Sequence, residues 1–325
     1  MFIKKDNKVE LIQGIPHGSH LDTVLGYAER LSEILSMKGE QVGSVVFEKG
    51  RIIKKKLKLK IYDVPLGVIT FRVVTDEKNV LLTTYPMLED LVEVEARILK
   101  VLEWKEWPEG DIVCEVSNEY GPQITFFAVD YLMKKDEYVR RENAKVGVGL
   151  LLYFLKVGVD ARKEVQGPGG ENIVIDLSEA EVLLPGTLNG GFIDDYIFTG
   201  HVKEFREVNV LGKDGYLLKI SIEPLGLVPA FVLKERVKGE IEKDAAVYGM
   251  GWLQGKVIGA RRGFEPRTSR SAASRPIQAR PPGHPKRYHQ KVVYKNFGTH
   301  EASSSFSQGW VPHQEEKDCG AVAGI

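Results

Sequence analysis

Acidic residues that could bind a cation or transfer a proton stand at the ends of strand-like segments. Asp194 and Asp195 are adjacent before one such segment, and Asp130 stands near the end of another. Carboxylates of this kind bind hard cations or act as paired general acids and bases. Because successive strand residues point to opposite faces, Asp194 and Asp195 are not expected to meet one substrate, and a turn role is favoured. No His or nucleophile is placed beside these acids, so a hydrolase is the third of the functions considered.

Two imidazoles stand three residues apart, at His17 and His20. A zinc site needs a third or fourth ligand, and no neighbouring Cys or His supplies one. We therefore interpret this segment as a polar loop in which Ser19 caps a following helix. We expect no metal site, no cofactor and no catalytic residue.

Lysines alternate at Lys56, Lys58 and Lys60. In a strand, these three side chains would share one face. Such a face is either solvated and protective of a sheet edge or a surface for an anionic partner. We favour the first interpretation.

Aromatic side chains offer a further binding chemistry, because they stack on the bases of single-stranded nucleic acid. Trp104 and Trp107 are candidates for this role, although aromatic residues in strands are more often part of a core, and a core role is favoured here. The full set of candidate binding residues is Lys56, Lys58, Lys60, Trp104, Trp107, Asp130, Tyr131, Asp194 and Asp195.

Composition is typical of a soluble globular protein of two or three domains. The 325 residues include 45 Lys and Arg against 45 Asp and Glu, and 43% are apolar. After residue 258 the sequence holds eleven basic and five acidic residues, so this part carries +6 and residues 1–258 carry −6. The Lys- and Glu-rich longer part suits a thermophilic protein. Two cysteines and the absence of a long apolar segment predict a cytoplasmic location and no membrane partner.

The elements that would position these residues begin with an α+β domain at residues 1–88. Apolar residues in residues 20–38 recur at the spacing of one helix face, and Gly39 follows as a stop signal. Four β-branched and aromatic segments come next, at residues 42–47, 57–62, 68–74 and 80–85. They predict an antiparallel meander on which the helix packs.

Two related β units are predicted at residues 95–158 and 196–258, with a connector at residues 159–195. Each has three strand-like segments, an interval and a longer strand-like segment, and EWKEW at residues 103–107 matches EFREV at residues 204–208. Short strands with one insert fit an OB-like closed barrel, and a β-sandwich has the same pattern. The fold class is therefore α+β, mainly β, with an internal duplication.

Three motifs resemble those of a group of small prokaryotic proteins with no assigned activity. They are ITFFAVDY with KKDEY at residues 124–138, DDYIFTG at residues 194–200 and GWLQG at residues 251–255. The resemblance covers about residues 96–257 and implies no catalytic residue. It does imply that the protein ends near residue 258.

The remaining segment, residues 259–325, is interpreted as a disordered or spurious tail. GFEPRT at residues 263–268 resembles translation of the antisense strand of a tRNA gene, and the Arg-, Pro- and Ser-rich sequence after it would resist packing. The alternative is an Arg-rich arm that binds nucleic acid.

The function predicted from these observations is non-catalytic binding or scaffolding, with an unknown partner that is a protein rather than a nucleic acid. Single-stranded nucleic-acid binding through the barrel-like units is the alternative. The acidic charge of residues 1–258 opposes it.

Overall fold

The structure is a computed structural model that describes residues 8–13, 17–26, 30–49, 55–118, 121–158, 162–166, 172–176, 180–189 and 192–259. The predicted tail lies outside these residues, except for Gly259. All described residues belong to one compact unit. Strands predominate, as expected from the sequence, and no helix in the described ranges is long and apolar enough to span a membrane.

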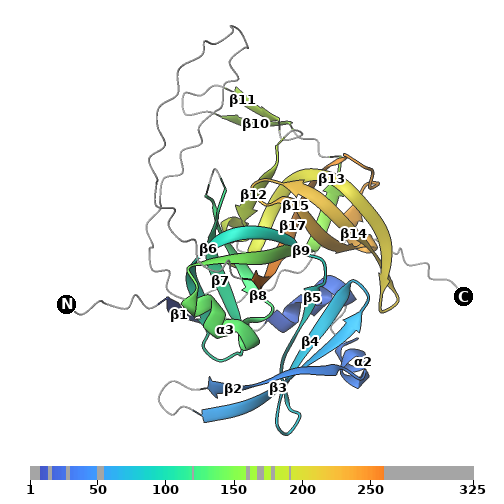
Figure 1. Cartoon of the computed structure of the whole chain (residues 1–325). Coiled ribbons are helices and arrows are strands. Elements are labelled where there is room, and N and C mark those ends of the chain that lie inside the picture. The colour runs from blue at the N-terminus through green and yellow to red at the C-terminus, as the bar shows by residue number, and fades with distance from the viewer. Residues whose placement is uncertain are drawn as a thin grey trace, which may run out of the picture. The chain divides into compact units, whose positions relative to one another are not determined.

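The predicted antiparallel meander is confirmed as a sheet of four strands in chain order (Figure 1). The strands are β2 (Glu40–Lys49), β3 (Lys55–Leu66), β4 (Ile69–Asp76) and β5 (Leu81–Leu88). The turn between β3 and β4 contains Gly67 at a φ of 80°, a conformation that glycine adopts without steric cost.

The single helix predicted at residues 20–38 is wrong. The segment instead forms a 3-10 turn, η1 (His17–His20), and two short helices, α1 (Leu21–Leu25) and α2 (Leu31–Ser36). Gly26 follows α1 at a φ of 74°, and this left-handed conformation ends a helix. The apolar face is retained, because Leu25 and Ile34 pack with Phe71 and Tyr85 of the meander.

The second sheet contains eleven described strands and includes both predicted β units. The first unit comprises β6 (Val92–Trp104), β7 (Gly110–Val116), β8 (Gln123–Ala128), helix α3 (Tyr131–Arg140) and β9 (Asn143–Val157). The second comprises β13 (Asp195–Val210), β14 (Lys213–Ile222), β15 (Gly226–Leu233), η4 (Lys234–Arg236), β16 (Val237–Lys238) and β17 (Ala246–Gly259). Both units therefore present three antiparallel strands, an insert and a long last strand.

Smaller elements accompany these units. β1 (Val9–Ile12) pairs in parallel with β6, and β12 (Val182–Pro185) pairs with β13. The connector also contains η3 (Gly186–Asn189) and a separate hairpin of β10 (Arg162–Gln166) and β11 (Asn172–Asp176).

The last strand of each unit pairs with strands of both units. β9 pairs with β6 of its own unit and with β15 of the other, whereas β17 pairs with β13 of its own unit and with β8 of the other. β9 and β17 also pair with each other along most of their length. Two closed rings result, β6–β7–β8–β17–β9 and β13–β14–β15–β9–β17, and neither consists of one continuous segment.

The predicted internal duplication and OB-like barrels stay predictions. The strand order is the same in both rings, and each first strand has a register shift at a similar place, between Ile98 and Lys100 in β6 and between Val202 and Glu204 in β13. The predicted domain boundaries also stay predictions.

One hydrophobic cluster joins the N-terminal helices and the meander to the rings. It contains Val24 of α1, Phe71 of β4 and Tyr85 of β5 together with Phe127 of β8 and Trp252 of β17. The N-terminal segment therefore packs directly on the strands that the two units share.

Candidate functional site

A buried cluster of ionisable side chains lies where the N-terminal segment meets both rings. His17 comes from η1 and Asp111 from β7, whereas Glu109 and Asp194 are the residues before β7 and β13. Each of these four residues is at most 1% exposed. Burial of so many ionisable groups is costly unless they are paired or bind a cation.

Glu109 holds the His17 imidazole in place. His17 Nδ1 is 2.8 Å from Glu109 Oε2, and the His17 backbone N–H donates to the same oxygen at 3.1 Å. The Thr83 hydroxyl donates to the other carboxylate oxygen of Glu109. The Nε2 edge of His17 therefore points away from Glu109 with a fixed orientation.

Two indoles orient the aspartates. Trp252 Nε1 donates to Asp194 Oδ2 at 2.5 Å, and Trp104 Nε1 donates to Asp111 Oδ2 at 2.7 Å. Each aspartate therefore keeps its Oδ1 oxygen for another partner.

Three buried polar atoms of the cluster have no hydrogen-bond partner among the described residues: His17 Nε2, Asp111 Oδ1 and Asp194 Oδ1. His17 Nε2 lies 3.0 Å from Asp194 Oδ2, but the contact does not meet hydrogen-bond geometry. One ligand atom from each of His17, Asp111 and Asp194 lies within 4.8 Å of the others. These three side chains have the residue types and the proximity of a metal site.

Aromatic rings enclose the imidazole. His17 stacks on Trp252 with ring centres 5.1 Å apart and an interplanar angle of 8°, and it meets Trp104 edge-on at 5.0 Å. The Phe127 ring centre is 4.4 Å away. Such walls keep water out and strengthen electrostatic interactions within the cluster.

The charges of the cluster depend on one another. Burial lowers the pKa of His17, but Asp194 and Glu109 outweigh this effect and raise the pKa well above its ordinary value. Burial raises the pKa of Asp111 well above its ordinary value, with a further contribution from Asp194. Burial also raises the pKa of Asp194, but His17 outweighs it and lowers the pKa overall. In the cation-free protein, the pKa directions favour a charged His17, an ionised Asp194 and a protonated Asp111.

His20 is adjacent to the cluster but does not share its chemistry. Its Nδ1 lies 3.2 Å from the His17 carbonyl oxygen, and its ring is 4.3 Å from that of Trp252. Burial, followed by the charge of His17, lowers the pKa of His20 to about 4. His20 is therefore neutral near pH 7.

The side chains of the adjacent residues Asp194 and Asp195 have different partners. Asp195 Oδ1 accepts a hydrogen bond from the Tyr153 hydroxyl at 2.7 Å, and its Oδ2 accepts from the Phe192 N–H at 2.8 Å. Burial raises the pKa of Asp195 to about 6. Only Asp194 reaches His17, as the alternation of strand side chains predicts.

Asp130 and Tyr131 lie at the start of α3 and are 8% and 2% exposed. The Asp130 carboxylate accepts hydrogen bonds from the Tyr138 hydroxyl at 2.6 Å and from the Val257 N–H at 3.1 Å. This carboxylate therefore joins α3 to the shared strand β17.

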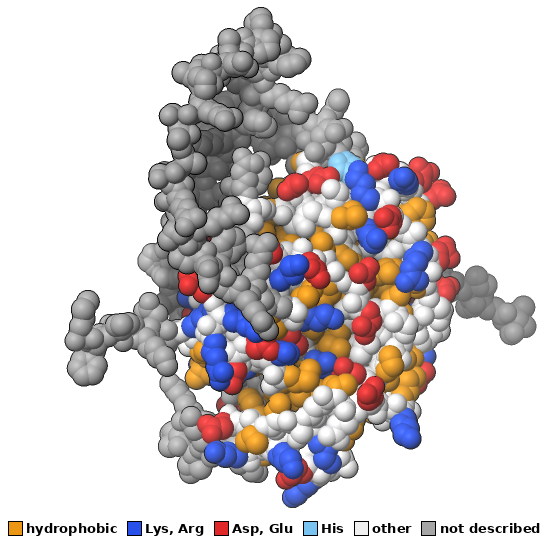
Figure 2. Space-filling view, viewed as in Figure 1, with side chains coloured by type: hydrophobic (Ala, Val, Ile, Leu, Met, Phe, Trp, Pro, Cys, Tyr) orange, Lys and Arg blue, Asp and Glu red, His pale blue; other side chains and the backbone are white. Residues whose placement is uncertain are grey.

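The positive charges of the candidate lysines lie near acidic side chains or hydrogen-bond acceptors. Lys56 is 3.7 Å from Glu48, and Lys58 is 3.6 Å from Glu77. Lys60 donates to the side-chain oxygen of Asn79 at 3.2 Å. Figure 2 shows positive and negative side chains interspersed over the face that it draws.

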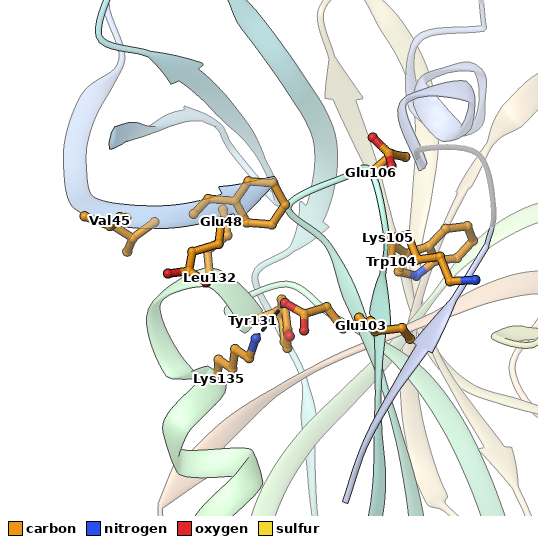
Figure 3. A pocket seen from close by; sticks show the side chains of 12 residues that line it. Val45, Glu48, Glu103, Trp104, Lys105, Glu106, Tyr131, Leu132 and Lys135 are labelled. Carbon is orange, nitrogen blue, oxygen red and sulfur yellow. Dashed lines mark hydrogen bonds and ion pairs between the residues drawn. The ribbon is translucent and has the colours of Figure 1, made fainter. Parts of the chain in front are cut away.

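A surface pocket of about 370 Å³ lies between β2, the end of β6 and α3 (Figure 3). Of the candidate residues, Trp104 and Tyr131 line it. Lys135 of α3 bonds to Glu103 of β6 across its floor at 2.6 Å. The pocket combines an apolar wall from β2 with paired charges.

A second pocket, of about 600 Å³, lies beside β1 and β6 and is lined by Trp104 and Phe192, among others. The aromatic side chains of Trp104 and Phe192 also lie near His17, with distances of 5.0 and 6.3 Å between their ring centres and that of the imidazole. Trp107 lines neither pocket.

Comparisons with known proteins give one weak likeness. No family model matches the sequence, and no curated protein does. The chain is similar to the molybdate-bound form of the cytoplasmic molybdate-binding protein ModG, with a TM-score of 0.27 and 10% identity over 51% of this chain and 94% of that chain. A TM-score of this size supports no inference about fold or ligand.

Sequence reasoning noticed His17 and Asp194 separately but did not connect them. It missed Glu109 and Asp111, which stand among ordinary charged residues of a strand start. One available signal was the position of Asp111 within the apolar segment at residues 110–116, where an acid is expensive to bury.

Proposed function

We propose that this protein is a non-catalytic binding protein and that its ligand is a small cation held by the His17 cluster. The proposal rests on two observations of His17, Asp111 and Asp194 in a fully buried site. Each side chain has a polar atom without a hydrogen bond, and the three bring one ligand atom apiece within 4.8 Å of one another. An unpartnered polar atom in a protein core costs about 1–3 kcal/mol. A bound cation would remove this cost for all three at once.

The balance of charge supports a cation rather than an anion. Glu109, Asp111 and Asp194 contribute three carboxyl groups, whereas His17 is the one imidazole between them. Bringing an anion to these carboxylates in a low-dielectric core would be strongly unfavourable. A cation would instead offset them.

The size of the site supports binding without catalysis. The three ligand atoms lie within 4.8 Å of one another, a spacing that suits a single ion. Neither of the two pockets described above is lined by His17, Asp111 or Asp194. The His17 cluster therefore lines neither of these two substrate-sized spaces.

Nucleic-acid binding receives less support. Trp104 is 3% exposed, so its face is not offered to bases, and Trp107 is half-buried. The lysines of β3 have acidic or amide neighbours. A cytoplasmic location and a protein partner remain part of the proposal as expectations from the sequence.

The test is cation-dependent stability of the protein after chelation and dialysis. Thermal unfolding is measured with Mg²⁺, Ca²⁺, Mn²⁺ or Zn²⁺, and a ligand at about 100 times its Kd stabilises by about 2.7 kcal/mol. We expect at least one cation to stabilise the wild type. Asp111→Asn should abolish this effect while leaving the cation-free protein folded, because an amide oxygen still accepts the Trp104 N–H.

Asp244→Asn is the matched control, since Asp244 lies at the surface and pairs with Lys203 at 2.9 Å. This variant should respond to cations as the wild type does. Failure of every cation to stabilise the wild type would overturn the proposal, as would an equal response in Asp111→Asn.

A further inference from the structure

We infer that the cation is a first-row transition ion of the Zn²⁺ class, bound by His17 Nε2 and one oxygen each of Asp111 and Asp194, rather than Ca²⁺ or Mg²⁺. The inference rests on the proposed function and specifies its ligand. It is carried by the donor atoms, their surroundings and the distance between two of them.

The donor set is mixed. An imidazole nitrogen with two carboxylate oxygens suits Zn²⁺, Mn²⁺, Fe²⁺ or Co²⁺, whereas Ca²⁺ takes six to eight oxygens and Mg²⁺ prefers oxygen and water in an octahedron. Within the described part of the chain, this group has only three such side chains. The aromatic walls formed by Trp252, Trp104 and Phe127 add no oxygen donor. A low coordination number with an imidazole ligand is therefore favoured.

The outer contacts of His17 are those of a metal ligand. A histidine bound to a metal nearly always donates its other ring N–H to a carboxylate or carbonyl, which fixes the tautomer. Glu109 Oε2 is placed to accept that hydrogen from His17 Nδ1 at 2.8 Å. Once a cation displaces the Nε2 proton of the charged imidazole, this arrangement leaves the Nε2 lone pair for the metal, on the side of Asp194.

The distance between His17 Nε2 and Asp194 Oδ2 agrees with shared coordination. Bonds of about 2.0–2.2 Å to a small ion place two of its ligands roughly 3–3.5 Å apart. The observed separation is 3.0 Å without hydrogen-bond alignment.

The experiment measures the selectivity of cation binding by the full chain. The protein is first freed of metal with a chelator and is then titrated calorimetrically with Zn²⁺, Co²⁺, Ca²⁺ and Mg²⁺. We expect one equivalent of Zn²⁺ to bind, with an affinity at least about 100-fold above those of Ca²⁺ and Mg²⁺. Co²⁺ should bind at the same site and develop visible absorption that one equivalent of Zn²⁺ removes.

Two variants test the residues. Glu109→Gln should weaken Zn²⁺ binding by about 10- to 100-fold while Ca²⁺ and Mg²⁺ affinities change less, because Glu109 acts by positioning His17. His17→Asn should remove the preference for Zn²⁺. His201→Asn is the matched control, since His201 lies outside the cluster beside Glu181 and should leave Zn²⁺ affinity unchanged.

The outcomes separate this inference from the proposed function. Binding of Ca²⁺ or Mg²⁺ that is as tight as that of Zn²⁺ would overturn the inference and leave the cation-binding function standing. Zn²⁺ binding that is unaffected in both folded variants would also overturn it. Binding of no cation at all would overturn both.

Discussion

At the scale of single residues, Asp130 shows how a buried acid is kept in this fold. Its two oxygens accept hydrogen bonds from Tyr138 and Val257, and Arg72 is nearby. Burial nevertheless dominates and raises the pKa of Asp130 to about 6 from 3.8. The folded protein therefore holds a proton here that the unfolded chain releases between these two pH values.

This pKa predicts the sign of a pH effect on stability. The contribution of the protonated Asp130 is fully present below pH 3.8 and is lost as pH rises through about 6. Between pH 4 and pH 7, the wild type should lose up to about 3 kcal/mol relative to Asp130→Asn, at about 1.4 kcal/mol for each pKa unit. Urea unfolding of both proteins across this range measures the difference. A difference independent of pH would contradict the shift.

At the scale of elements, the shared strand β17 depends on close approach of backbones. A Cβ atom on Gly255 would lie 2.6 Å from the Phe126 ring and 2.8 Å from the Gly147 carbonyl oxygen. Neither neighbour is the end of a flexible chain, so the strand or ring must shift.

Gly255→Ala should therefore destabilise the protein by about 1–3 kcal/mol, the usual cost of overpacking. Gly43→Ala is the matched control in β2, where the nearest atom is the flexible Met133 sulfur at 3.2 Å, and it should cost less. Chemical unfolding of the two variants measures both values, and equal costs would contradict the role given to Gly255.

The N-terminal elements should also report on the cation. His17 lies on η1, whereas Asp111 and Asp194 belong to different rings, so an ion would tie all three segments together. We predict that chelation increases amide hydrogen exchange in residues 17–25 more than in β14. If amide hydrogen exchange in residues 17–25 did not change after the cation had been removed, this would contradict the prediction that the ion holds this segment in place.

At the scale of the whole molecule, exchange of β9 and β17 makes each ring depend on the other. Residues 89–158 alone lack β17, so their ring stays open between β8 and β9. We predict that this fragment shows no cooperative unfolding transition, and that adding a fragment of residues 192–259 restores one. A cooperative transition in residues 89–158 alone would show that the unit closes without its partner strand.

Local sequence patterns predicted the positions of the strands better than they predicted which strands pair. Short β-branched and aromatic segments predicted the meander β2–β5, because such side chains fit a pleated, half-buried strand. Gly26 broke the expected helix, since one positive φ outweighs an apolar spacing. Pairing of β17 with β8 joins residues more than 100 positions apart, and no local pattern specifies it.

The candidate site was hidden for the same reason. His17 was set aside because no third ligand stood near it in the sequence, and its partners Asp111 and Asp194 arrive through tertiary pairing. Strand alternation predicted that Asp194 and Asp195 point to opposite faces. The residues next to Asp194 in the sequence did not indicate that its side chain lies beside His17.

The most direct test of the central claim is a crystal structure of the protein grown with Zn²⁺, with anomalous scattering recorded at the zinc edge. We predict one anomalous peak in the core, about 2.0–2.2 Å from His17 Nε2 and from one oxygen each of Asp111 and Asp194. A map with zinc peaks only at the surface, and none between these three side chains, would contradict the claim that the His17 cluster binds Zn²⁺.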